Sequence, residues 1–203
     1  IRAVAASSRP GRVFERDAVS LKLSALHPRF EEAKRVRVFA ELLPRLQSLA
    51  GLAREGGIGI TLDAEESERL ELTLDLFDAL ARDPDLEHWH GLGIAVQAYQ
   101  KRAAAVCDWV VALARAARRR VTVRLVKGAY WDGEVKRAQQ LGMTDYPVFT
   151  RKTATDLSYT ACAARLLQAA DAVYPAFATH NCRSVATILE LAGDRHPRRR
   201  IEA

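Results

Sequence analysis

Apolar residues along the chain follow two patterns, short continuous or alternating runs and longer stretches with helical spacing. The short runs predict strands, and a stripe such as Leu70, Leu74 and Phe77 predicts a helix lying on a sheet. The predicted strands are residues 19–23, 58–62, 93–97, 121–127 and 172–179. Besides the helix through Leu70, the predicted helices are residues 31–53, with Pro44 starting a second half, 101–119, 132–141, 150–170 and 183–191.

Strands and helices therefore alternate along the whole chain. This β-α-β-α order calls for a parallel sheet covered by helices, either doubly wound or a (β/α)₈ barrel. No G-x-G-x-x-G follows any predicted strand, so the usual fingerprint of the dinucleotide-binding doubly wound fold is missing. The predicted fold class is α/β, with 203 residues long enough to bury a sizeable core.

The run Val-Thr-Val-Arg-Leu-Val-Lys-Gly-Ala-Tyr-Trp at residues 121–131 carries the most informative chemistry. Arg124 interrupts an apolar strand, where a guanidinium is costly unless an anion meets it. Gly128 then lets the backbone come close to a ligand, and Tyr130 and Trp131 offer flat apolar faces. We interpret this stretch as the floor of a site for a large anionic ring compound.

Polar residues also gather at the carboxyl end of every predicted strand. Taken strand by strand they are Lys22 and Ser24, Asp63 and Glu65, Gln97 and Gln100, Arg124 and Lys127, and Thr179, His180 and Asn181. Sites in parallel-sheet folds, and in barrels above all, are built at this end. One such residue could be a salt-bridged structural group, but their agreement over five strands predicts a functional site.

Composition and charge narrow the classes of protein. Hydrophobic residues make up 49% and charged residues 28%, and neither a membrane-spanning run nor a secretory signal is visible. The net charge of +6 is concentrated in the runs 118–120 and 198–200, which we interpret as solvated faces or, alternatively, as a nucleic-acid patch. Cys107 and Cys162 lie in helical patterns and are expected to be buried free thiols of a cytoplasmic protein.

The residues alone leave the chemistry open. Lys22 lies between two leucines, so partial desolvation of its ammonium would suit a carboxylate or a Schiff base. Asp63, Glu65 and His180 have the residue types of a catalytic metal site, although no H-x-H or H-E-x-x-H spacing is present. A Schiff-base or metal-assisted barrel lyase and a non-catalytic basic nucleic-acid-binding segment are therefore the alternatives.

Six longer motifs resemble the proline dehydrogenase domain of the bifunctional proline utilization A family. They are KLSALHPR at 22–29, DAEE at 63–66, QAYQKR at 97–102, RLVKGAYWD at 124–132, YPVFTRK at 146–152 and FATHN at 177–181. The resemblance covers nearly all of residues 1–203 and is highly specific. It implies a distorted (β/α)₈ barrel, of which this chain would supply about five of eight strands and be truncated at both ends.

The resemblance implies FAD, no metal, and oxidation of L-proline to 1-pyrroline-5-carboxylate with electrons passed to a membrane quinone. The residues expected at FAD are Gln97, Arg124, Val126, Lys127, Gly128, Trp131, Thr150, Lys152, Thr179, His180 and Asn181. Lys22 is expected to meet the substrate carboxylate, Asp63 to organise the charged site, and Tyr130 to pack on the proline ring. A cation such as Arg124 suits the negative charge of a reduced flavin.

The resemblance also implies context outside this segment. The family suggests a fused aldehyde dehydrogenase domain and, in some members, a DNA-binding domain. We expect a cytoplasmic protein with peripheral association to the inner face of the membrane. An arginine pair that clamps the substrate carboxylate in the family is absent from these residues, so we expect the segment to be inactive by itself.

Overall fold

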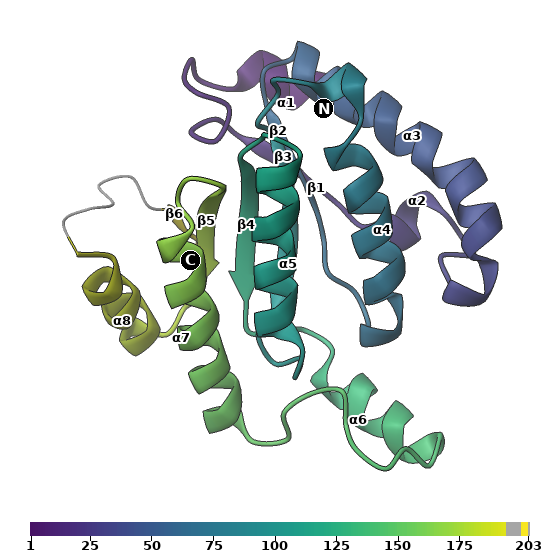
Figure 1. Cartoon of the computed structure of the whole chain (residues 1–203), viewed down its shortest axis with the longest axis vertical. Helices are drawn as coiled ribbons and strands as arrows, with labels where there is room; N and C mark the ends of the chain where they lie inside the picture. The colour runs from purple at the N-terminus through teal and green to yellow at the C-terminus, as the bar shows by residue number, and fades with distance from the viewer. Residues whose placement is uncertain (194–199, 203) are drawn as a thin grey trace. The chain divides into compact units, whose positions relative to one another are not determined.

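The computed structural model describes residues 1–193 and 200–202, with side chains described through residue 193 (Figure 1). They form two compact units, residues 1–94 with 113–122, and residues 95–112 with 123–203. Three elements contribute residues to both units: β3 (Leu92–Gln97), α5 (Ala103–Ala116) and β4 (Val121–Val126). The hydrogen-bonded strands follow chain order from β1 to β6, and the predicted α/β parallel sheet is confirmed.

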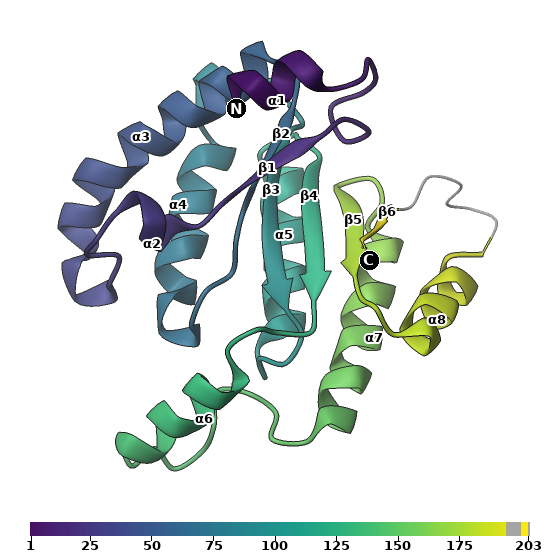
Figure 2. The ribbon, with the colours of Figure 1, turned by 180° about the vertical axis from the view of Figure 1, so that it is seen from behind.

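The first unit contains a parallel strand pair, β1 (Ala18–Leu21) with β2 (Gly59–Leu62). Its helices are α1 (Arg2–Ser7), α2 (Leu23–Leu26), η1 (Glu32–Lys34), α3 (Arg35–Glu55), η2 (Ser67–Arg69), α4 (Leu70–Ala81) and η3 (Pro84–Leu86). Leu21 of β1 pairs with Leu62 of β2, and Leu62 in turn pairs with Ile94 of β3. Helices α3 and α4 lie side by side in both views (Figures 1 and 2).

Helix α3 continues through Pro44 as one helix of 21 residues, so the predicted second start at Pro44 is wrong. A proline inside a helix removes one backbone hydrogen bond and crowds the preceding turn. A fully buried stripe that includes Val38, Leu42 and Leu46 runs past the proline on both sides. The burial of this stripe keeps the helix continuous, because packing outweighs local propensity.

The second unit carries the remaining elements. They are α6 (Trp131–Gln140), α7 (Lys152–Gln168), β5 (Val173–Ala178), α8 (Cys182–Ala192) and β6 (Arg200–Glu202). Helix α7 packs against both β5 and α8, and β5 pairs in parallel with β6 (Figure 2). The sequence did not predict β6 or the single-turn helix α2, because elements of three or four residues are too short to show periodicity.

Candidate active site

The carboxyl ends of β3 and β4 in the second unit are tied together by backbone and side-chain hydrogen bonds. The Tyr99 amide donates to the Lys127 carbonyl oxygen at 2.7 Å. Gln97, the last residue of β3, is 3% exposed, and its Oε1 accepts from the Ala129 N–H at 3.1 Å. Gln97 therefore positions the turn that follows β4.

The two faces of β4 differ in burial. Val121, Val123 and Leu125 are buried, whereas Arg124 and Val126 are half-buried and share the opposite face. The expectation of a guanidinium enclosed in an apolar strand is corrected, because strand alternation places Arg124 on the more open face. This position leaves the guanidinium accessible to an anion without full desolvation.

Gly128 has an intramolecular reason to be glycine. Its φ is +140°, and a Cβ there would lie 2.4 Å from the aromatic ring of Tyr99. Both the backbone conformation and the close approach of this ring exclude a side chain. Packing against Tyr99 thus gives one reason for the glycine, and the approach of a ligand to this turn stays a prediction.

The aromatic residues after Gly128 begin α6. Trp131 is 42% exposed, and its indole Nε1–H donates to the carbonyl oxygen of Phe149 at 2.9 Å. The Phe149 amide in turn donates to the Tyr99 carbonyl oxygen at 2.8 Å. Tyr130 is half-buried, and Thr150 is exposed next to Phe149. The indole is thus held in place while part of it stays accessible.

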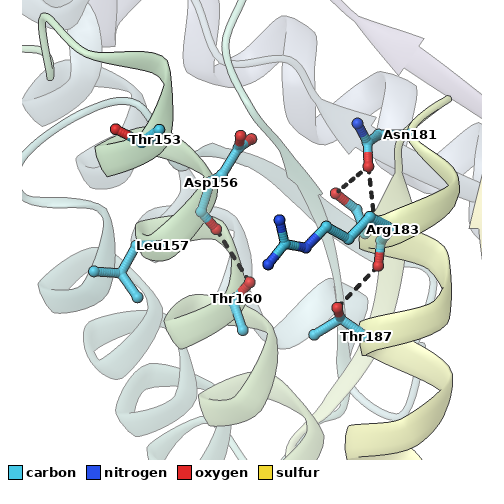
Figure 3. A pocket seen from close by; sticks show the side chains of 8 residues that line it. Thr153, Asp156, Leu157, Thr160, Asn181, Arg183 and Thr187 are labelled. Atoms are coloured by element: carbon cyan, nitrogen blue, oxygen red, sulfur yellow. Dashed lines mark hydrogen bonds between the residues drawn. The ribbon is translucent and has the colours of Figure 1, made fainter.

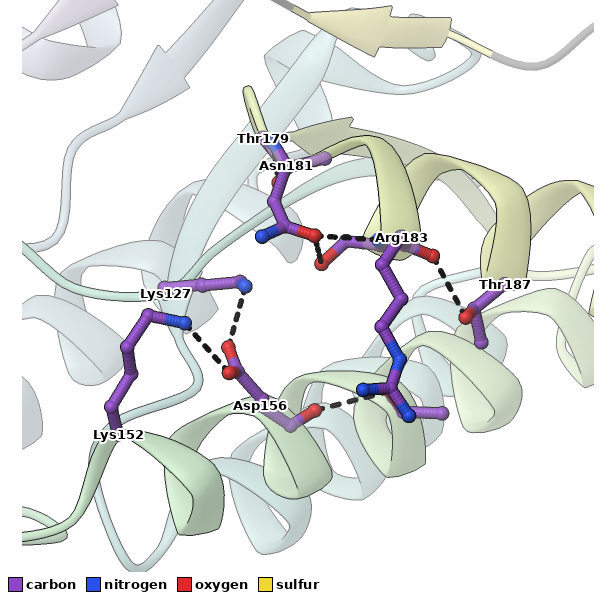
Figure 4. A network of polar contacts seen from close by, with 9 residues as sticks. Lys127, Lys152, Asp156, Thr179, Asn181, Arg183 and Thr187 are labelled. Atoms are coloured by element: carbon purple, nitrogen blue, oxygen red, sulfur yellow. Dashed lines mark hydrogen bonds and ion pairs between the residues drawn. The ribbon is translucent and has the colours of Figure 1, made fainter.

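A carboxylate that the sequence analysis did not single out joins two of the predicted cations (Figure 4). Asp156 on α7 accepts from Lys127 Nζ at 2.5 Å through Oδ1 and from Lys152 Nζ at 2.7 Å through Oδ2. The hydrogen bonds from Lys127 and then Lys152 hold the pKa of Asp156 below its usual value. The spacing of four residues between Lys152 and Asp156 could have indicated their pairing.

The end of β5 is organised around the start of α8. Thr179 is buried, and its Oγ1 accepts from the Asn181 N–H at 3.1 Å, whereas His180 is exposed. Asn181 Oδ1 accepts from the Ser184 N–H at 3.0 Å, which makes Asn181 the N-cap of α8. At least part of the role of Asn181 is therefore structural.

A pocket of about 510 Å³ opens between the first turns of α7 and α8 (Figure 3). The guanidinium of Arg183 points from α8 toward α7 across this pocket. The lining residues are Thr153, Asp156, Leu157, Thr160, Asn181, Arg183, Ser184 and Thr187. Of these, only Asn181 belongs to the predicted site. The others lie on helices α7 and α8, away from the strand ends where the site was predicted.

A family model described as proline dehydrogenase matches residues 1–203. The chain belongs to the proline dehydrogenase family. It is 52% identical over 196 residues to the bifunctional protein PutA of Escherichia coli K12, covering 97% of this chain and 15% of that protein. It is 51% identical over 198 residues to the PutA of Rhizobium meliloti, covering 94% and 16%. The chain thus spans about one sixth of these relatives.

Solved structures of the proline dehydrogenase family show the same fold. A Bradyrhizobium japonicum proline utilization A mutant superposes with a TM-score of 0.92 at 53% identity, over 94% of this chain and 20% of that one. Proline utilization A from Bdellovibrio bacteriovorus, inactivated by N-propargylglycine, gives 0.82 at 34% identity over 86% and 18%. The predicted TIM-barrel-type fold is confirmed by these neighbours.

Two of the three residues predicted to contact the substrate, Lys22 and Asp63, lie in the first unit. Lys22 directly follows Leu21 and Asp63 directly follows Leu62, which are paired residues of β1 and β2. Asp63 is half-buried, but Lys22 is exposed, so its expected desolvation is not found. The leucines on either side of Lys22 turn inward while the lysine turns outward, which removes the main argument for a lowered-pKa Schiff-base lysine.

Glu65 is a satisfied structural carboxylate. It is 4% exposed, and its Oε1 accepts from the Ser24 N–H at 2.9 Å. Its Oε2 accepts from the Ser24 hydroxyl and pairs with Arg69 at 2.9 Å. Among the described residues, no three His, Cys, Asp or Glu side chains come together as metal ligands would. The geometry around Glu65 therefore does not support its role in the metal-assisted alternative.

The arginine run at 118–120 is not a uniformly solvated face. Arg118 is exposed, but Arg119 is only 7% exposed, and its burial lowers the pKa of the guanidinium. The guanidinium of Arg120 lies over the ring of Phe14 at 5.3 Å. The run contributes to packing in the first unit, which weakens its interpretation as a nucleic-acid patch. Residues 198 and 199 of the second run, and the side chain of 200, lie outside the described part.

The expected thiols are found where helical patterns placed them. Cys107 of α5 and Cys162 of α7 are buried and free, and Cys182 at the start of α8 is exposed. A hydrogen bond to Cys162, together with burial, raises the pKa of Cys107. Cys107 is therefore expected to remain a thiol.

Proposed function

We propose that this chain is part of an FAD-dependent enzyme that oxidises L-proline to 1-pyrroline-5-carboxylate. Membership of the proline dehydrogenase family supports the reaction. The observation that carries the proposal furthest is the cluster at the ends of β3 and β4. There, Lys127 and Trp131 are held in fixed positions by partners within the same unit. Such fixed groups suit a preorganised cofactor site.

The residues of this cluster fit a flavin dinucleotide. Lys127 and Lys152 share the single carboxylate of Asp156, so the three groups together carry one positive charge. That charge suits an anionic dinucleotide. Trp131 offers an anchored indole with 42% of its surface exposed, as a flat ring would require. When bound, FAD would supply the acceptor for the hydride that leaves the carbon next to the proline nitrogen.

The predicted cofactor residues of β3 and β4 have different proposed tasks. We assign Arg124 and Val126 of β4, with Gln97 of β3, to the ring surroundings, because they come from adjoining strand ends. Arg124 would favour negative charge that develops on the ring. Gln97 would keep the backbone of the next turn in place through Ala129.

The other proposed cofactor contacts come from the segments that follow β4 and β5. The contacts after β4 are Lys127, Gly128, Trp131, Thr150 and Lys152, and those after β5 are Thr179, His180 and Asn181. Thr179 is buried and bonded to the Asn181 amide, so it would stabilise the bend between β5 and α8. His180 is exposed and would be available to a bound molecule.

The substrate contacts remain proposals of the same kind. Lys22 would bind the proline carboxylate, as its exposed ammonium allows. Asp63 would balance charge around the substrate, and Tyr130 would pack on its ring. The proline amine must be neutral when hydride leaves the adjacent carbon, and no described residue stands out as its base.

The partners of the intact protein are inferred from the relatives. We propose that a quinone accepts the electrons and that the protein associates peripherally with the inner face of the membrane from the cytoplasm. No described helix combines the length and apolarity needed to span a bilayer. The named relatives are bifunctional, which supports an aldehyde dehydrogenase domain outside this segment, and a DNA-binding domain is a further proposal.

The decisive experiment is a visible spectrum of the purified intact protein before and after anaerobic addition of L-proline. We expect a flavin spectrum that bleaches with L-proline and not with D-proline. Replacing Lys22 by Met should leave the flavin content unchanged and raise the KM for proline at least tenfold, since a charged hydrogen bond is lost. The matched control is Lys101→Met, because Lys101 pairs with Asp145 at 2.5 Å outside the proposed site.

Two results would contradict the proposal. The first is a protein that is colourless, does not take up added FAD and leaves proline unchanged. The second is trapping of a substrate adduct on Lys22 by borohydride, which would support the lyase instead.

A further inference from the structure

The carboxylate of Asp156 connects two segments that contribute proposed cofactor residues. Lys127 directly follows β4, whereas Lys152 and Asp156 lie one helical turn apart at the start of α7. Each oxygen of the carboxylate binds one ammonium, at 2.5 Å for Lys127 and 2.7 Å for Lys152 (Figure 4). A single residue thus fixes the distance between the turn after β4 and the first turn of α7.

Lys127 is also held on a second side. Its Nζ lies 5.6 Å from the centre of the Tyr159 ring, and Tyr159 is 1% exposed. Asp156 and Tyr159 are three residues apart on α7, so they meet the same ammonium from one helix face. The Lys127 side chain is 23% exposed, and a flexible side chain thereby acquires one defined position.

The position of Lys127 matters because of its neighbours in sequence. Gly128 follows it and packs against Tyr99, and Trp131 is bonded to Phe149. Lys127 is the charged member of a segment whose other contacts are fixed by packing or hydrogen bonds. Without Asp156, the two ammonium groups would repel each other and would separate.

We propose that Asp156 is a positioning residue that holds Lys127 and Lys152 together for the anionic part of the cofactor. This inference rests on the proposed function, since it takes the two lysines as cofactor contacts. It adds a residue that lies at no strand end and in none of the predicted site positions. Asp156 and Arg183 are both among the residues that line the pocket between α7 and α8. Asp156 therefore acts through the lysines and need not touch the cofactor itself.

The test uses the intact protein, stripped of flavin and titrated with FAD. We expect Asp156→Asn to weaken FAD binding about tenfold, the loss expected when one charged hydrogen-bond partner is removed. Asp156→Glu should restore most of the affinity, because a carboxylate is kept. Asp145→Asn is the matched control, since it removes the carboxylate of another pair of 2.5 Å, with Lys101 in the same unit, and its FAD affinity should equal that of the wild type.

A second measurement needs no flavin. In the apoprotein, acetylation of Lys127, followed by peptide mass spectrometry, should become several-fold faster in Asp156→Asn because the amine loses its partner. In a Lys127→Met, Lys152→Met background, Asp156→Asn should change FAD affinity less than twofold. A structural role alone would leave the effect of Asp156→Asn unchanged by the lysine substitutions.

The outcomes separate this inference from the proposed function. If the wild-type protein binds no FAD, both are rejected. If the wild type binds FAD and Asp156→Asn binds it equally or more tightly, only the positioning role is rejected. Tighter binding would mean that the carboxylate merely cancels positive charge. The positioning role would also be overturned if Asp156→Asn weakened FAD binding equally with the two lysines present and with both replaced by Met.

Discussion

At the scale of single residues, Gly128 is restricted both by its backbone conformation and by a neighbouring ring. Its φ is +140°, and the ring that excludes a side chain there belongs to Tyr99. Arg124, four residues earlier, is half-buried on the more open face of β4. Which face of β4 is buried cannot be predicted from its sequence, since both faces carry aliphatic residues.

The structural reason for Gly128 leads to a stability prediction. Gly128→Ala should lower the free energy of unfolding by about 3 kcal/mol, from the strained backbone and from overpacking against Tyr99. We would measure this by denaturant unfolding of the intact protein, followed by tryptophan fluorescence.

Gly133→Ala is the control for that substitution. Gly133 lies inside α6, and nothing approaches the position of its Cβ within 4 Å. The control should be neutral or stabilise by about 0.5 kcal/mol, because alanine favours helix. An equal, small effect of both substitutions would contradict the explanation given for Gly128.

At the scale of elements, the order of strands and helices could be predicted because their hydrophobic periods differ. The predicted ends of the elements were less accurate, and the end of β1 affects the environment of Lys22. β1 ends at Leu21, so Lys22 lies outside the strand and turns outward instead of being enclosed between two leucines. Asp156 could not be predicted from residues at strand ends, because it lies one turn into helix α7.

The N-cap of α8 separates a structural role of Asn181 from its proposed cofactor role. Asn181→Ala should cost about 1 kcal/mol of stability, because the Ser184 amide loses its acceptor. Asn181→Ser keeps a capping oxygen and should stay within about 0.5 kcal/mol of the wild type. We would compare thermal unfolding of the two variants and their FAD affinities.

The serine variant is the informative one. Weaker FAD binding by a stable Asn181→Ser would support a direct cofactor contact. Wild-type affinity in Asn181→Ser would restrict Asn181 to capping. Equal destabilisation by serine and alanine would contradict the capping role.

At the scale of the whole molecule, the sequence could predict a parallel α/β fold and the end of the sheet that carries the site. Motifs at strand ends supplied that information. The contacts that join distant segments depend on packing, which no local pattern records. Glu65 to Ser24 spans 41 residues, and Lys127 to Asp156 spans 29. Each unit thus contains a buried or half-buried carboxylate whose long-range partner, Ser24 for Glu65 and Lys127 for Asp156, only the structure reveals.

The charge pairs also determine how stability depends on acid. Lys127 and Lys152 lower the pKa of Asp156, and Lys101 together with the Tyr146 amide lowers the pKa of Asp145. A carboxyl whose pKa is lower in the folded state adds stability at pH values above its unfolded pKa of about 3.9. That stability is lost as the pH falls from there through the folded pKa, since protons then favour the unfolded chain.

We therefore expect Asp156→Asn to differ most from the wild type at pH 6 and to approach it below about pH 4, where the wild type loses the same contribution. The difference at pH 6 should be at most about 1 kcal/mol, because the Asp156 side chain is 38% exposed and solvent screens the pairs. It should also shrink in 1 M salt. Denaturant unfolding of flavin-free intact protein at pH 3, 4, 5 and 6 would measure it. A difference that stays constant over this range, or grows toward acid, would show that Asp156 stabilises the fold by something other than its charge.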